Sequence, residues 1–128
     1  MEIPFRNSAA APQFIGSDAV VENSIITEGC AIEGTVINSV LSANVTVEKG
    51  AVVKDSVIMQ GTTVKANAKV LYSIIDEEAV VGEGAVVGKE KETAKEVTVL
   101  GMGANLCAGA KVEEGKILSA EDVKGGNN

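Results

Sequence analysis

The sequence predicts an all-β fold, a single-domain parallel β-solenoid of about five to six triangular coils, on three observations. Serines flanked by aliphatic residues recur at positions 24, 39, 56 and 73, with spacings of 15, 17 and 17 residues. Aliphatic residues recur in steps that are usually six, five and six residues, which together make one coil of 17. Prolines occur only at Pro4 and Pro12, so no later residue interrupts a long ladder of backbone hydrogen bonds.

Each coil is expected to bury three aliphatic anchors, one from each side of the triangle. A step of six residues is too short for a helix and a loop, but it fits a short strand and a corner. Successive coils then stack about 4.8 Å apart, with like anchors above one another. The second coil is two residues short because Ile32 and Val36 are only four residues apart. The predicted rows are Ile15, Ile32, Val47, Val64, Val81 and Leu106; Val21, Val36, Val53, Val70, Val87 and Val112; and Ile26, Leu41, Ile58, Ile75, Leu100 and Ile117.

A second set of inward positions is expected four residues after most anchors, near the corners. Space is smaller there, which favours small side chains, and glycines suit corner backbone conformations. The predicted second positions are Ala19, Ile25, Cys30, Val40, Val45, Ala51, Val57, Thr62, Ala68, Ile74, Ala79, Ala85, Ala104 and Ala110. The predicted corner glycines are Gly29, Gly34, Gly50, Gly61, Gly82, Gly84, Gly103 and Gly109.

The segment 89–96 is expected to be a loop extruded from a corner. Val87 and Leu100 are 13 residues apart, whereas the equivalent step elsewhere is five, so the surplus is eight residues. Seven of the eight residues in 89–96 are Lys, Glu or Thr. Without them, Thr98 takes the place of the repeated serine and Val99 that of a second inward position. No other segment looks locally helical, and steps of six and five do not keep one face of a 3.6-residue helix, so helical and βαβ folds are disfavoured.

Composition excludes several functions. The chain has 11 basic and 18 acidic residues, a net charge of −7, which disfavours binding to nucleic acid or to an anionic membrane. No apolar run reaches the roughly 20 residues of a membrane span, and no signal peptide is visible. The two cysteines, Cys30 and Cys107, are expected to be reduced thiols of a cytoplasmic protein. The absence of histidine removes His-based catalysis and most zinc sites.

The remaining candidates for chemistry have simpler structural interpretations. The repeated hydroxyl residues are expected to cap backbone groups at a corner, since no base is available to activate them. The acidic run 76–78 is expected to be a solvated corner, and Cys30 a small buried side chain. Gly101 and Gly103 are followed by no basic residue that could bind phosphate, so they are assigned to corners. We therefore assign no catalytic, cofactor-binding or metal-binding residue. The hydroxyl residues are Ser24, Ser39, Ser56, Ser73 and Thr98, and the acidic run is Asp76, Glu77 and Glu78.

Several stretches resemble the C-terminal domain of bacterial ADP-glucose pyrophosphorylases, also called glucose-1-phosphate adenylyltransferases, and of their companion regulatory subunits. The likeness covers residues 4–87 well and residues 97–118 more loosely. Its most specific parts are the Gly-Cys-x-Ile-x-Gly-x-Val and Asp-Ser-Val-Ile-Met motifs. These motifs begin at Gly29 and Asp55, and the stretch Pro12-Gln13-Phe14-Ile15-Gly16 precedes them.

The resemblance implies a left-handed, hexapeptide-repeat β-helix without catalytic machinery. Residues 1–14 would be a linker from a missing catalytic domain, 15–118 the β-helix and 119–128 a C-terminal tail. The domain would serve oligomerisation and allosteric regulation in glycogen biosynthesis. Its partners would be the catalytic domain and other subunits of a homo- or hetero-oligomer. The parent enzyme would be a cytoplasmic nucleotidyltransferase that uses ATP and Mg. Similarity to plant relatives raises a role for Lys111 and Lys116 in binding phosphorylated activators, although ordinary surface lysines are favoured.

Two alternatives stay open. One is the tail domain of another sugar-nucleotide transferase, such as a mannose-phosphate guanylyltransferase. The other is a hexapeptide-repeat acyltransferase, which is disfavoured because such enzymes resemble this fold but need a catalytic histidine. A γ-type carbonic anhydrase, which needs three histidine ligands, is disfavoured for the same reason.

Overall fold

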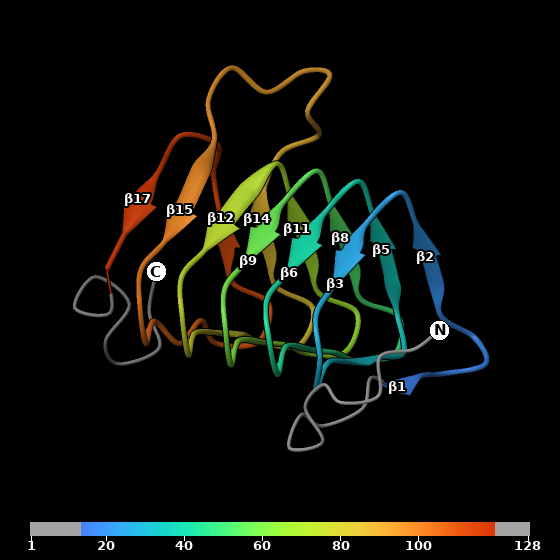
Figure 1. The fold of residues 1–128 in the computed structure, drawn as a ribbon. Helices are drawn as coiled ribbons and strands as arrows, with labels where there is room; N and C mark the ends of the chain where they lie inside the picture. Colours follow the sequence, from blue (N-terminus) through green and yellow to red (C-terminus); the bar gives the residue numbers. More distant parts are fainter. Residues whose placement is uncertain (1–13, 120–128) are drawn as a thin grey trace.

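The computed structural model describes residues 14–119, which form 17 short strands and no helix. The strands are arranged in three parallel sheets that enclose a triangular interior (Figure 1). Seen from the N-terminal end, the chain turns anticlockwise as it moves away, so the solenoid is left-handed (Figure 1). The predicted fold class is confirmed. Within the described part, no helix is long and apolar enough to cross a membrane.

Each side of the triangle is one sheet, and each coil contributes one strand to each side. Sheet A contains β1 (Phe14–Ile15), β4 (Ala31–Ile32), β7 (Thr46–Val47), β10 (Thr63–Val64) and β13 (Val80–Val81). Sheet B contains β2 (Val20–Glu22), β5 (Thr35–Ile37), β8 (Val52–Lys54), β11 (Lys69–Leu71), β14 (Val86–Gly88) and β16 (Lys111–Val112). Sheet C contains β3 (Ile25–Ile26), β6 (Val40–Leu41), β9 (Val57–Ile58), β12 (Ser73–Ile75), β15 (Thr98–Leu100) and β17 (Ile117–Leu118).

The strand registers confirm the predicted anchor rows except at one residue. In sheet B, for example, Val53 pairs with Val70 and Val70 with Val87. In sheet C, however, Leu100 pairs with Leu118, and Ile117 is 74% exposed. The prediction of Ile117 as an anchor was therefore wrong, because the last coil takes a step of six residues from Val112 where the earlier coils take five.

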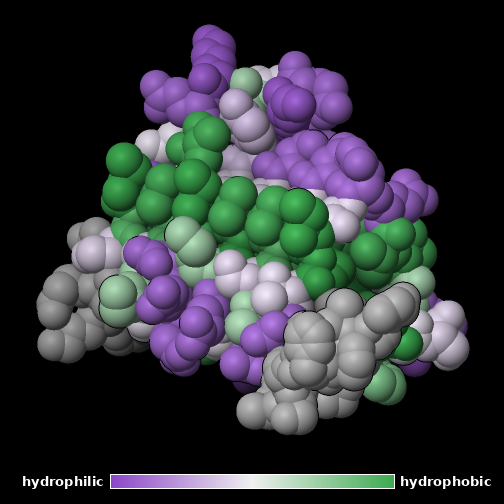
Figure 2. All heavy atoms as spheres, in the orientation of Figure 1, coloured by the Kyte–Doolittle hydropathy of each residue, from purple (hydrophilic) through white to green (hydrophobic). Residues whose placement is uncertain are grey.

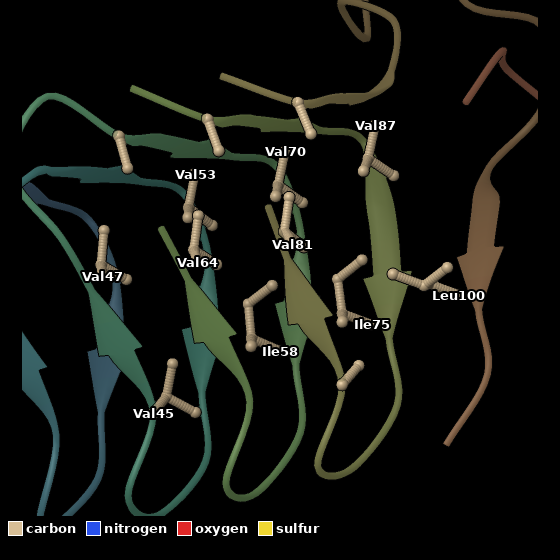
Figure 3. Packing of buried hydrophobic residues seen from close by; sticks show 14 of the residues in the cluster. Val45, Val47, Val53, Ile58, Val64, Val70, Ile75, Val81, Val87 and Leu100 are labelled. Atoms are coloured by element: carbon tan, nitrogen blue, oxygen red, sulfur yellow. The ribbon is translucent and has the colours of Figure 1, made fainter. Parts of the chain in front are cut away.

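The interior is a stack of aliphatic side chains contributed by all three sheets (Figure 3). Anchors from Ile32 to Leu106 are almost fully buried, and Val112 and Ala110 close the C-terminal side. Burial of branched aliphatic groups on a pleated surface is the main stabilising contribution to this fold.

The predictions of second inward positions were correct near two corners and wrong near the third, which lies between sheets B and C. Cys30, Val45 and Ala51 are buried as predicted, but Ile25 is 64% and Val40 is 38% exposed. The cause is the step length. When two successive anchors are six residues apart, the fourth residue after the first anchor lies two residues before the second and therefore faces inward with it. When they are five residues apart, the fourth residue lies directly before the second anchor and faces outward. At the corner between sheets B and C, the serine therefore takes the inward position.

The corners use residues suited to tight backbone conformations. The residue before each serine at the corner of sheets B and C has a positive φ, as in Asn38 with φ 50°. In the short second coil, a Cβ added to Gly34 would lie 2.5 Å from the carbonyl oxygen of Ala51 and 2.7 Å from that of Glu48. Only glycine fits this corner, which explains how the coil closes with two fewer residues.

Residues 89–97 leave the solenoid between β14 and β15 as a loop at the corner of sheets B and C (Figure 1). Beyond it, Thr98 pairs with Ser73 and is buried, while Val99 faces outward beside Ile74. Most of the predicted N-terminal linker, residues 1–13, and all but one residue of the predicted tail, 120–128, lie outside the described residues.

Candidate interaction surface

The repeated hydroxyl residues form a hydrogen-bonded ladder inside the corner between sheets B and C. The hydroxyl of Ser39 donates to the carbonyl of Ile37 at 2.8 Å and accepts from the N–H of Ser56 at 3.1 Å. The same pair of bonds recurs around Ser56, linking each coil to the next. Because each hydroxyl donates to one backbone group and accepts from another, these side chains hold the corner together, as predicted.

Thr62 performs the same task at the corner between sheets C and A. Its hydroxyl donates to the carbonyl of Asp76 at 2.7 Å and lies 3.4 Å from the N–H of Ala79. Thr62 was predicted to lie inside, but no hydrogen bond was assigned to it. Its position two residues before an anchor, shared with Ser39 and Ser56, was the available signal.

The other sequence candidates sit apart from one another. Cys30 is buried, and its thiol donates to the carbonyl of Ser42 at 3.1 Å. Asp76 accepts the N–H of Glu77 at a solvated corner, and Lys111 and Lys116 are exposed. Among residues 14–119, no group of three or more His, Cys, Asp or Glu side chains could hold a metal ion.

The outward side chains of sheet C form a continuous stripe of exposed and half-buried residues, which we call the aliphatic ladder. Its members pair in register, each with the next along the sheet. Figure 2 shows it as a hydrophobic band across the whole face. We missed this surface in the sequence because all six of its members were predicted to lie inside. The ladder consists of Ile25, Val40, Val57, Ile74, Val99 and Ile117.

The ladder is bordered by a shallow hollow at one end and by a charged loop along one edge. The hollow, about 450 Å³, is lined by residues of the first two coils, including Ile25 and Val40. The loop 89–97 lies above the band without covering it (Figure 2). It is held to the solenoid by an ion pair between Lys54 and Glu90, whose charged atoms are 3.1 Å apart. The hydrogen bond that the Lys54 ammonium donates to Glu90, followed by the negative charge of Glu90, raises the pKa of Lys54.

Comparison with known proteins gives one family and two kinds of relative. A family model described as GlmU-like, C-terminal hexapeptide, matches residues 11–107. Glucose-1-phosphate adenylyltransferases of Bacillus thuringiensis (strain Al Hakam) and Bacillus anthracis are each 44% identical over 85 residues. That match covers 66% of this chain but only 23% of each relative, so the chain corresponds to about a quarter of their length.

Solved structures of two acetyltransferases share the fold. The acetyltransferase domain of PglB from Neisseria gonorrhoeae FA1090 has a TM-score of 0.54 at 23% identity, covering 80% of this chain and 50% of that one. A mutant of perosamine N-acetyltransferase from Caulobacter crescentus, in complex with CoA and GDP-perosamine, has a TM-score of 0.56 at 20% identity, covering 87% and 52%. At these identities the likeness concerns the fold alone.

Proposed function

Since the chain belongs to the GlmU-like, C-terminal hexapeptide family, we propose that it is the non-catalytic C-terminal β-helix of a glucose-1-phosphate adenylyltransferase or of its companion subunit. It holds subunits together and transmits regulatory state to a catalytic domain. The observation that carries the proposal is the 44% identity to these enzymes over 85 residues, against 20–23% to the acetyltransferases of similar fold. The exposed aliphatic ladder supports an assembly role, because uninterrupted apolar surface of this kind marks interaction sites.

The parent enzyme would act in the cytoplasm, making ADP-glucose for glycogen from ATP and glucose 1-phosphate with Mg. The described residues do not fit a magnesium–nucleotide site, since they bring no three potential ligands together and no basic residue follows the Gly101–Gly103 corner. Nucleotide and metal would therefore bind on the catalytic domain. Lys111 and Lys116 remain exposed lysines to which we assign no effector.

A chimeric enzyme tests the assignment. The matching 85-residue stretch of the Bacillus anthracis enzyme would be replaced by that of this chain, and ADP-glucose formation would be measured. We expect an active, fully assembled enzyme. The control chimera carries the β-helix of the perosamine N-acetyltransferase, which has the fold but not the sequence. A correctly folded but inactive first chimera would reject the proposal.

The acyltransferase alternative predicts a different result. The isolated chain would be incubated with acetyl-CoA and a panel of amino sugars, including GDP-perosamine. We expect no acetylated product, because the chain contains no histidine to remove a proton from an amine. Enzyme-dependent acetylation would overturn the proposed function. If the chain were instead the tail of another sugar-nucleotide transferase, a chimera with that enzyme's catalytic domain would be active. The chimera with the glucose-1-phosphate adenylyltransferase would then make no ADP-glucose.

A further inference from the structure

The aliphatic ladder is an uncharged face on an acidic protein. None of the six strands of sheet C contains a charged residue, whereas sheet B carries Glu22, Lys54, Lys69 and Lys111 in its strands. Ile25 and Ile117, at the two ends, are 64% and 74% exposed, and Ile74 in the middle is 37% exposed. Although the chain has a net charge of −7, two copies can approach each other through this face, because no strand of sheet C places a carboxylate against the other copy.

We infer that the ladder pairs with the ladder of a second copy about a two-fold axis that runs parallel to the strands and passes between β9 and β12. The inference rests on the proposed function, since it names the partner of an assembly domain. In this antiparallel dimer, Ile25 meets Ile117 of the other copy, Val40 meets Val99, and Val57 meets Ile74. The ladder is nearly palindromic in side-chain size, so isoleucine meets isoleucine at both ends, and each contact occurs twice about the axis, as in any isologous interface.

The distribution of charge along the solenoid selects the antiparallel arrangement. Residues 14–49 carry five acidic side chains and one lysine, Lys49, which pairs with Asp18 at 3.8 Å, whereas residues 89–119 carry five lysines and five glutamates. A two-fold axis along the solenoid would place one acidic end against the other. The antiparallel dimer places each acidic end beside the neutral, lysine-bearing end of the other copy, which avoids the like-charge repulsion. The five acidic residues are Asp18, Glu22, Glu28, Glu33 and Glu48.

The shape of the face agrees with this pairing. Ile117 is the most exposed of the large hydrophobic side chains described. The hollow of about 450 Å³ lies at the opposite end of the ladder, next to Ile25 and Val40. The antiparallel dimer brings the projecting Ile117 of each copy to the hollow of the other. Five strand spacings make the ladder about 24 Å long. Since it is only one residue wide, it buries less than the ~800 Å² per partner of a typical stable interface. We therefore expect a dimer that dissociates on dilution.

Sedimentation equilibrium of the full chain over a range of concentrations tests the partner. We expect a monomer–dimer equilibrium, and Ile74→Lys should raise its dissociation constant by at least about tenfold. Val20→Lys is the matched control, because Val20 is similarly exposed, at 42%, but lies on sheet B. It should leave dimerisation unchanged. A strictly monomeric wild-type chain, a trimer, or equal effects of the two substitutions would overturn the inference.

Thiol crosslinking tests the orientation. In a Cys107→Ser background, Ile25→Cys chains would be mixed with Ile117→Cys chains and treated with a bismaleimide whose spacer is about 10 Å long, because sheets packed face to face lie about 10 Å apart and a direct disulfide cannot span that distance. We expect linked mixed dimers and no linked dimer from Ile25→Cys alone. Linkage of Ile25→Cys to itself would overturn the antiparallel geometry, as would the absence of mixed dimers. These results leave the chimera and acetylation assays unaffected, so the inference can fail while the proposed function stands.

Discussion

The hydroxyl of Ser56 joins two coils by accepting the N–H of Ser73 at 3.1 Å while donating to the carbonyl of Lys54 at 2.8 Å. Both residues are almost fully buried, so water cannot replace either bond. The corner between sheets B and C thus depends on a side chain for hydrogen bonds that the strands themselves do not supply.

Replacing this hydroxyl should cost stability in proportion to its burial. Ser56→Ala leaves the buried N–H of Ser73 without its partner, whereas the carbonyl of Lys54 keeps its bond from the N–H of Tyr72, and we expect a loss of about 1–3 kcal/mol in the free energy of unfolding. Ser24→Ala removes the equivalent bonds at the half-buried end of the same row, where water can substitute. Urea unfolding of both variants checks the difference, and equal losses would contradict the role assigned to burial.

The inward and outward positions of one strand can be tested with neighbouring residues. Val70→Asp places an unpaired carboxylate among fully buried anchors and should destabilise the fold by several kcal/mol. Lys69→Asp, one position earlier, faces solvent and should stay within about 0.5 kcal/mol of the wild type. Thermal unfolding followed by circular dichroism distinguishes them, and similar melting temperatures would mean that the register is incorrect.

The short second coil should tolerate no side chain at its corner. Gly34→Ala would force the new Cβ against two backbone carbonyls, and overpacking of this kind costs about 1–3 kcal/mol. Gly16→Ala, at the equivalent corner one coil earlier, meets its nearest atom at 3.3 Å and should be affected less. The comparison again uses urea unfolding; a neutral Gly34→Ala would show that the corner can relax.

Deleting residues 89–96 should preserve the β-helix. The loop lies outside the stacked strands, and shortening a surface loop changes closure entropy only slightly. We expect unchanged or slightly higher thermal stability, together with loss of the Lys54–Glu90 ion pair. Lys54→Ala, which breaks the same ion pair in the intact loop, serves as the control. An unfolded deletion variant would show that the segment contributes to the core.

The periodic part of the sequence was sufficient to predict the sheets and nearly all the anchors. Step lengths of five and six identify which aliphatic residues stack, because every coil repeats the same constraint. The exposed face was not predicted, since Val40 and Ile74 are as apolar as the anchors beside them. Only the alternation of the pleat, counted back from Leu41 and Ile75, shows that Ser39 and Ser73 point inward instead. The last anchor was misplaced because no following coil fixes the spacing after Val112.

The nearest-neighbour stacking of coils has a consequence for local unfolding. Apart from the first and last coils, each coil is held by backbone bonds to one coil on either side, and Val53 at the centre has both partners, Val36 and Val70. Among residues 14–119, Phe14 and Leu118, in the first and last strands of the solenoid, pair on one side only. Amide hydrogen exchange should therefore be slowest near β8 and β9 and accelerate toward both ends, as in a one-dimensional array that frays from its termini.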